Sequence, residues 1–399
     1  MSAPSWGPLG YRFEAPRPRR MLALDGGGIR GLLSLGVLAA LERKLAAHYR
    51  RGDFRLCHFF DYIAGTSTGA ITAAALSRGL SVQQVVDFYQ LYGEEIFKKR
   101  RWGIWNSLYR NGPLEQRLKQ VYGEQSTLEA GNLNSLLLVV MRNATTDSAW
   151  PLSSNPFAMY NEPGLLHCNL RVPLWRLVRA STAAPVFFPA EVIEWEVGNA
   201  EQTFAFVDGG TTAYNNPAFL LFRMATEPRY RLGWQRGEDK LLIVSVGTGE
   251  NAELGLTAED PVSNLVTAGK NTLVSLMSQA AYDQDVNCRT IGRCIAGGPI
   301  DLELGDLVLP PSATAKDWGR AFLYARYNAL LEPSWLETHG LGDIDAASVR
   351  GLDAVDRMPE LRRIGDVVGA AIKVEDFGVF LNEPLYVEGQ VVAPLGAGA

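Results

Sequence analysis

The sequence predicts an α/β fold organised around a largely parallel sheet. Short apolar runs, typical of strands buried on both faces, alternate with segments of helical periodicity. Several of these runs end directly in a glycine turn that leads into a helix. From about residue 260 the pattern is mostly helical, and we expect that part to pack on the sheet instead of forming a separate unit.

Each element is assigned from the residues in chain order. Strands with their following turns are expected at 21–24, 59–65, 135–145, 203–210 and 240–249. Helices are expected at 29–45, 66–79, 81–97, 114–123, 175–185 and 263–286. Residues 146–164 are expected to be a loop. The chain thus divides into an irregular N-terminal arm (1–20), a catalytic core (21–255) and a mostly helical C-terminal region (256–399).

Composition excludes several classes of protein. The 399 residues are 47% hydrophobic and 20% charged, enough for a substantial core. A net charge of −5 without long runs of like charge argues against a nucleic-acid polymer as partner. No apolar stretch is long enough to span a bilayer, so we expect any membrane contact to be peripheral. The four cysteines show no C-x-x-C spacing: Cys57, Cys168, Cys288 and Cys294. We therefore expect reduced thiols, a cytoplasmic protein, and neither a metal nor a cofactor.

The first glycine turn matches G-x-G-x-x-G through Gly26, Gly28 and Gly31. A dinucleotide site would need a carboxylate at the end of the next strand, and that strand runs directly into another glycine turn. Asp25, immediately before the glycines, would oppose a pyrophosphate. A phosphorylated ligand or nucleotide at this turn therefore stays the alternative hypothesis, in which the protein is a non-enzymatic binding module.

The second glycine turn has the pattern of a nucleophile elbow. Gly65-Thr66-Ser67-Thr68-Gly69 is G-x-S-x-G between a buried strand and a helix, the context in which such a serine is lifted off the sheet. The N-terminus of the following helix directs partial positive charge at developing negative charge. Ser67 is therefore the candidate nucleophile.

A nucleophilic serine needs a base, and the sequence offers two kinds. Asp208 ends a strand and is followed by Gly209 and Gly210, which places its carboxylate where α/β enzymes bind ligands. The chain has four histidines, and none of them lies in a catalytic motif: His48, His58, His167 and His339. Only His339 lies downstream of Asp208, and it is in an expected loop. We favour Asp208, and a Ser–His pairing stays the alternative.

The first glycine turn then has a function beside this serine. Successive backbone N–H groups of Gly26, Gly27 and Gly28 at a helix N-terminus form an anion site, as a tetrahedral acyl intermediate requires. Arg30 can add positive charge nearby.

Together these motifs resemble the patatin-like phospholipase family over about residues 20–250. The order is that of the family: Asp25-Gly26-Gly27-Gly28-Ile29-Arg30-Gly31, then Gly65 to Gly69, then Asp208-Gly209-Gly210. The segments "RASTAAPVFFP" (179–189) and "VSVGTG" (244–249) also look like the family.

This resemblance implies a three-layer αβα sandwich related to α/β-hydrolases. It implies a Ser67–Asp208 dyad, an oxyanion hole built by the glycine run, and metal-free hydrolysis of lipid acyl esters. Bacterial members of about this size resemble antiphage effectors that cyclic nucleotides switch on. That resemblance implies an activator bound by the helical third or at an interface of a homo-oligomer.

The stretch 96–110 combines cationic and aromatic side chains without an acidic residue. Such a mixture suits an anionic lipid interface, here the inner face of the membrane. The alternative is a solvated basic loop whose aromatic rings pack on the core. The candidate interface residues are Phe97, Lys98, Lys99, Trp102 and Trp105.

Overall fold

A computed structural model of the chain describes residues 4–97, 111–185, 187–196, 198–250, 265–309 and 319–393. Within them, nine strands form one central sheet: β1 Arg19–Leu24, β2 Tyr62–Thr66, β3 Leu136–Asn143, β4 Ser148–Ser153, β5 Glu191–Glu194, β6 Thr203–Asp208, β7 Leu241–Val246, β8 Arg293–Ala296 and β9 Leu323–Tyr327. A separate small hairpin consists of β10 Leu385–Val387 and β11 Gln390–Val392.

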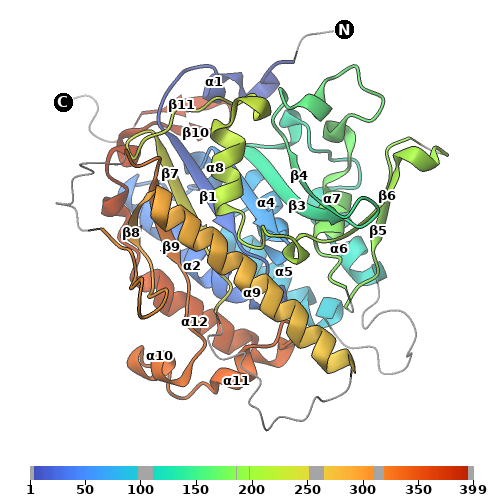
Figure 1. Cartoon of the computed structure of the whole chain (residues 1–399). Coiled ribbons are helices and arrows are strands. Elements are labelled where there is room, and N and C mark those ends of the chain that lie inside the picture. Colours follow the sequence, from blue (N-terminus) through green and yellow to red (C-terminus); the bar gives the residue numbers. More distant parts are fainter. Residues whose placement is uncertain are drawn as a thin grey trace.

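The α-helices of the described ranges are α1 Gly10–Phe13, α2 Gly31–His48, α3 Leu56–Phe59, α4 Thr68–Ser77, α5 Val82–Phe97, α6 Asn111–Tyr122, α7 Leu174–Ser181, α8 Ala218–Thr226, α9 Leu265–Ile291, α10 Pro333–Thr338, α11 Ala346–Val349 and α12 Met358–Ala370. None of these helices combines the length and the apolar composition that crossing a bilayer requires. Figure 1 shows their arrangement around the sheet.

The sheet is mixed but mostly parallel. Its order is β5-β6-β3-β2-β1-β7-β9-β8, with β4 also paired to β3. The run from β3 to β8 is parallel, and the antiparallel pairs gather at the other end, among β3, β4, β5 and β6. This confirms the α/β fold with a mostly parallel sheet.

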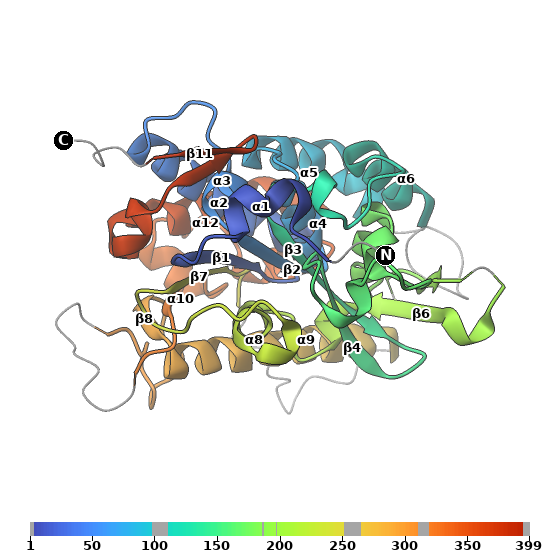
Figure 2. The same ribbon diagram turned by 90° about the horizontal axis from the view of Figure 1, so that it is seen from above.

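Helices cover both faces of the sheet, which makes three layers (Figure 2). The helices α8 and α9 lie on one face, while α2, α4, α5 and α12 lie on the other. Because side chains alternate along a strand, β1 feeds both cores. Leu22 and Leu24 pack with α2 and α4, whereas Met21 and Ala23 pack with α8.

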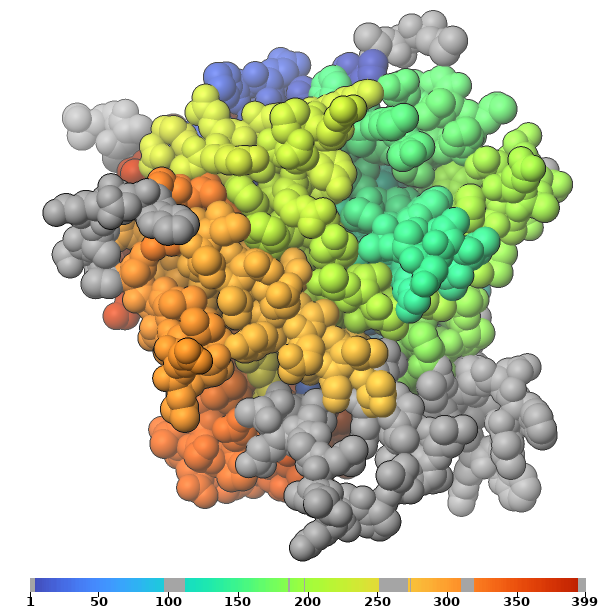
Figure 3. Space-filling model, in the orientation of Figure 1, coloured from blue at the N-terminus to red at the C-terminus, as the bar shows by residue number. Residues whose placement is uncertain are grey.

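The layer of α2 and α12 explains why α2 is apolar almost all round. Glycines let the two helices approach closely, since a Cβ on Gly365 would lie 2.0 Å from the carbonyl oxygen of Leu33. On the opposite face, the yellow and orange segments that include α8 and α9 form much of the surface seen in Figure 3.

The structure differs from the sequence expectations in four places. The expected loop 146–164 contains β4, and Phe59 belongs to α3 instead of a strand. Residues 7–13 of the expected irregular arm are helical. The sheet does not end at residue 255, because β8 and β9 belong to it. Whether the three segments are separate domains stays a prediction.

Candidate active site

The candidate site lies where the carboxyl ends of β2 and β6 meet along one edge of β3. Strand β2 runs parallel to β3 and ends with Thr66 opposite Val140. Strand β6 runs antiparallel to β3 and ends with Asp208 opposite Met141. Since β4 occupies the other edge of β3 at Met141, β2 and β6 share one edge. The residues at their carboxyl ends therefore face each other across one register step.

Ser67 occupies the strained turn between β2 and α4. Its backbone has φ 54° and ψ −123°, a conformation that non-glycine residues rarely adopt. The flanking glycines make this turn possible, because a Cβ on Gly65 would lie 2.1 Å from the carbonyl oxygen of Gly69. The N–H of Ser67 donates to Ser181 Oγ at 2.9 Å, and Ser181 Oγ donates to the carbonyl of Val140 at 2.6 Å.

Asp208 is the hydrogen-bond partner of this serine. Ser67 Oγ donates to Asp208 Oδ2 at 2.6 Å, and the N–H of Gly210 donates to Asp208 Oδ1 at 2.7 Å. The carboxylate is 1% exposed. Burial raises the pKa of Asp208 to about 6, against the opposing effect of the two hydrogen bonds. The group is ionised at neutral pH but is a stronger base than an exposed aspartate.

The glycine turn after β1 lies beside the serine, and its N–H groups are not equivalent. The N–H of Gly26 donates to the carbonyl of Asn215 at 3.1 Å and is therefore not free to hold an oxyanion. Gly27 and Gly28 donate to no backbone carbonyl within the described ranges. Gly28, with φ +60°, lines the cavity over Ser67. The structure thus leaves Gly28 and Gly27 as candidate donors and excludes Gly26.

Other residues of the first motif serve the turn in different ways. Asp25 forms a two-point ion pair with Arg326, at 2.9 and 2.7 Å. Gly31 allows close packing on α4, since a Cβ there would lie 2.5 Å from Thr68 Oγ1. Arg30 is 4% exposed and does not line the cavity over Ser67. Its Nε and Nη1 lack a partner in the described part of the chain, and burial lowers its pKa to about 10.

The cavity over Ser67 has mostly apolar walls, which suits an acyl chain. Two wall residues, Met277 of α9 and Leu352, come from the C-terminal third, which carried no motif in the sequence. Ser181, inside the segment 179–189 that resembles the family, bonds the N–H of Ser67, and Asn215, which the sequence did not point to, bonds the N–H of Gly26. The cavity is lined by Gly28, Ser67, Thr68, Ile71, Leu114, Thr182, Ala184, Phe187, Phe188, Asp208, Met277 and Leu352.

None of the four histidines, all of which the structure describes, lines this cavity. His58 is buried and its Nδ1 accepts a hydrogen bond from the N–H of Arg55. His339 stacks on Trp335 with ring centroids 3.9 Å apart. His167 lines another cavity, beside Trp150. The alternative Ser–His pairing is therefore wrong for this structure.

The expected membrane-interface residues fall almost entirely outside the described residues. Lys98, Lys99, Trp102 and Trp105 are not described, and Phe97 is described only as the last residue of α5.

A serine on a strained strand–helix turn, in a three-layer α/β fold, is the arrangement that carries the nucleophile in serine hydrolases. Residues 22–222, half of the chain, match the family described as patatin-like phospholipase. The chain belongs to the patatin-like phospholipase family.

Known relatives share this family over part of their length. Patatin group J-1 of Solanum tuberosum is 27% identical over 251 residues, which cover 59% of this chain and 62% of that protein. The 85/88 kDa calcium-independent phospholipase A2 of Rattus norvegicus is 29% identical over 267 residues, covering 62% of this chain and 29% of that protein. The chain thus spans less than two thirds of either relative.

Among solved structures, human GIVD cytosolic phospholipase A2 aligns with 94% of this chain and 61% of its own, with a TM-score of 0.43 and 12% identity.

Proposed function

We propose that this protein is a phospholipase of the A type, which hydrolyses acyl ester bonds of glycerophospholipids through a Ser67–Asp208 dyad. The observation that carries the proposal is the 2.6 Å hydrogen bond from a strained serine hydroxyl to a buried carboxylate. Family membership supports acyl-ester hydrolysis, and the apolar cavity over Ser67 supports a lipid substrate.

In the first half-reaction Asp208 acts as general base. As Ser67 Oγ attacks the ester carbonyl, its proton passes to Asp208 Oδ2, already in hydrogen-bond contact. The carbonyl oxygen becomes an anion, which the N–H groups of Gly28 and Gly27 stabilise. When the tetrahedral intermediate collapses, the C–O bond breaks and the lysolipid alkoxide takes the proton from Asp208. An acyl-Ser67 ester remains.

The second half-reaction repeats these steps with water. Asp208, ionised again, takes a proton from a water molecule that attacks the acyl carbonyl. The same N–H groups hold the second oxyanion, and its collapse returns the proton to Ser67 Oγ. A fatty acid leaves, and the enzyme is regenerated.

A fluorophosphonate probe tests this proposal directly, because it phosphonylates only an activated serine. We expect labelling of the wild-type chain and none of Ser67→Ala. Lipidomics of membranes incubated with each protein should show lysolipid and fatty acid with the wild type alone. A folded, activated wild-type chain that neither labels nor releases fatty acid would refute the hydrolase and favour a binding module at the glycine turns.

We further propose that the enzyme acts at the inner face of the membrane after activation by a cyclic nucleotide. The cavity over Ser67 holds about 30 Å³, room for about one water molecule, so lipid entry requires wall residues such as Phe187 and Leu352 to move. Such a closed state suits an enzyme that must not attack its own membrane. Calorimetry with cyclic di- and trinucleotides tests activation, and binding of none would refute it.

The stretch around Trp102 and Trp105 is the proposed lipid contact, on the strength of its sequence alone. Liposome binding should weaken when both tryptophans are replaced by alanine. Unchanged affinity for anionic liposomes would remove this proposal without touching the dyad.

A further inference from the structure

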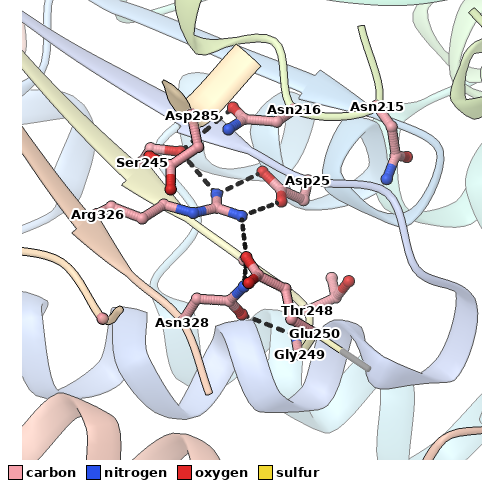
Figure 4. A network of polar contacts seen from close by, with 12 residues as sticks. Asp25, Asn215, Asn216, Ser245, Thr248, Gly249, Glu250, Asp285, Arg326 and Asn328 are labelled. Carbon is pink, nitrogen blue, oxygen red and sulfur yellow. Dashed lines mark hydrogen bonds and ion pairs between the residues drawn. The ribbon is translucent and has the colours of Figure 1, made fainter. Parts of the chain in front are cut away.

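The guanidinium of Arg326, in β9, lies at the centre of a buried polar cluster behind the glycine turn (Figure 4). Its Nη1 donates to Asp25 Oδ1 at 2.9 Å and to Ser245 Oγ at 2.8 Å. Its Nη2 donates to Asp25 Oδ2 at 2.7 Å and lies 3.5 Å from Glu250 Oε1. The side chain of Arg326 is 1% exposed. Asp25 is therefore fixed in both position and rotation by a two-pronged, desolvated contact.

Asp25 is the residue that joins β1 to the glycine turn. Its own N–H donates to the carbonyl of Val246 in β7 at 3.1 Å. One residue later, the N–H of Gly26 donates to the carbonyl of Asn215. The path of the chain into Gly27 and Gly28 is thus set by Asp25 and what holds it.

A second connection reaches the same turn from the next strand end. Asn328, two residues after Arg326, donates from Nδ2 to Glu250 Oε1 at 2.6 Å and accepts the N–H of Gly249 at 2.8 Å (Figure 4). Thr248 Oγ1 in that loop donates to the carbonyl of Gly26 at 3.0 Å. Arg326 in β9 and Asn328 just after β9 therefore hold the glycine turn from two sides.

Burial raises the pKa of Asp25 to about 6, against the opposing effect of Arg326, so the pair is ionic at neutral pH. Burial opposes a charge on Arg326, but the attraction of Asp25 outweighs it and holds the pKa of Arg326 well above its usual value. Glu250 and Asp25 face the guanidinium directly, and Asp285 of α9 and the Tyr324 hydroxyl also act on it. Asp285 is itself paired with Arg289 at 2.7 Å. Arg326 is thus the cation that neutralises Asp25.

We propose that Arg326 is a positioning residue for the hydrolysis: it holds Asp25, and through it the N–H groups of Gly27 and Gly28, where the oxyanion forms. This inference rests on the proposed function. Arg326 stands more than a hundred residues beyond the segment that matches the family, 22–222, so the C-terminal part of the chain contributes to the active site. A purely structural ion pair would affect folding and leave turnover unchanged.

The test compares Arg326→Met, which keeps the aliphatic stem, with Arg326→Lys, which keeps the charge but not the two-pronged geometry. With a soluble acyl ester, we expect kcat to fall about 100-fold in Arg326→Met and about 10-fold in Arg326→Lys, because misplaced oxyanion donors cost rate at this scale. KM should change less than about threefold, since the apolar walls of the cavity are untouched. The rate of fluorophosphonate labelling should fall in parallel with kcat.

The matched control is Arg12→Met, which removes another fully buried arginine, at 2.9 Å from Asp61. It should lower thermal stability without lowering kcat of the folded protein. The double variant Asp25→Asn/Arg326→Met should lose little more activity than Arg326→Met, because both changes break one contact. Additive losses, or a kcat in Arg326→Met equal to wild type, would overturn this inference alone. A wild-type chain without Ser67-dependent hydrolysis would overturn the proposed function as well.

Discussion

Two buried aspartates lie at opposite ends of β2, and their surroundings differ. Asp61 precedes the strand and is fully buried. Arg12 Nε donates to it at 2.9 Å, Arg17 forms a second ion pair, and the N–H of Arg20 donates at 2.9 Å. Asp208 meets the other end of β2, where its hydrogen bonds come from the Ser67 hydroxyl and the Gly210 N–H. The two ends are about 20 Å apart.

The same burial has opposite consequences at the two ends. At Asp61 burial would raise the pKa, but Arg17, Arg12 and Arg20 outweigh it and hold the pKa well below its usual range. At Asp208 burial dominates, and the pKa rises to about 6. A buried carboxylate surrounded by arginines stabilises the fold, whereas one left with neutral donors is available as a base.

The largest effect should come from Asp208→Asn. Asparagine keeps the shape of the carboxylate but cannot accept the Ser67 proton, so kcat/KM should fall by about 10² to 10⁴. Ester hydrolysis and the rate of fluorophosphonate labelling both measure this loss. His339→Ala is the matched control and should retain nearly full activity, because its ring packs on Trp335. Full activity in Asp208→Asn would refute the dyad.

The reverse pattern is expected of Asp61→Asn. Removing the carboxylate leaves several arginine charges buried without compensation, which should lower the free energy of unfolding by about 3–5 kcal/mol. Urea denaturation measures this change. Turnover by the folded fraction should stay within about twofold of wild type. A large loss of kcat at unchanged stability would contradict the assignment of a stabilising role to Asp61 and a catalytic role to Asp208.

The pH dependence of activity sharpens the same contrast. Only ionised Asp208 can act as base, and burial also raises the pKa of Asp25 to about 6. We therefore expect kcat/KM to fall at least tenfold for each pH unit below about 6 and to level off above it. The labelling rate should follow the same curve in wild type and in His339→Ala. A profile that loses its midpoint in His339→Ala would indicate a histidine base instead.

The two strand ends of the candidate site could be predicted from sequence because short-range sterics determine them. The serine turn requires small residues on both sides, and the apolar run before it identifies the strand. Strand β4 was missed because Pro151, opposite Val140, interrupts the strand pattern. Such a proline is compatible with a strand whose described pairing is on one side only.

The contribution of the C-terminal third could not be predicted, because it depends on sheet order. Arg326 reaches Asp25 only since β9 pairs with β7 and β7 with β1, which joins positions three hundred residues apart. One signal was present: "FLYARY" (322–327) places a cation inside an otherwise buried strand. A charge in that position needs a buried partner, but the sequence does not say which.

The smallest expected effect is on the free energy of unfolding, which the burial of Asp208 lowers at neutral pH. The pKa of Asp208 is raised in the folded state, so the folded chain binds more protons than the unfolded chain between about pH 4 and 6. Stability therefore falls as pH rises through that window, and Asp208 costs about 1–3 kcal/mol at neutral pH.

Asp208→Asn does not titrate. Its free energy of unfolding relative to wild type should be higher at pH 8 than at pH 4.5 by about that amount, as measured by urea denaturation at both values. Asp25 and Asp61 titrate equally in both proteins and cancel in this difference. An unchanged difference between the two pH values would show that Asp208 is not held at an elevated pKa, and the assignment of this carboxylate as the base would lose its physical ground.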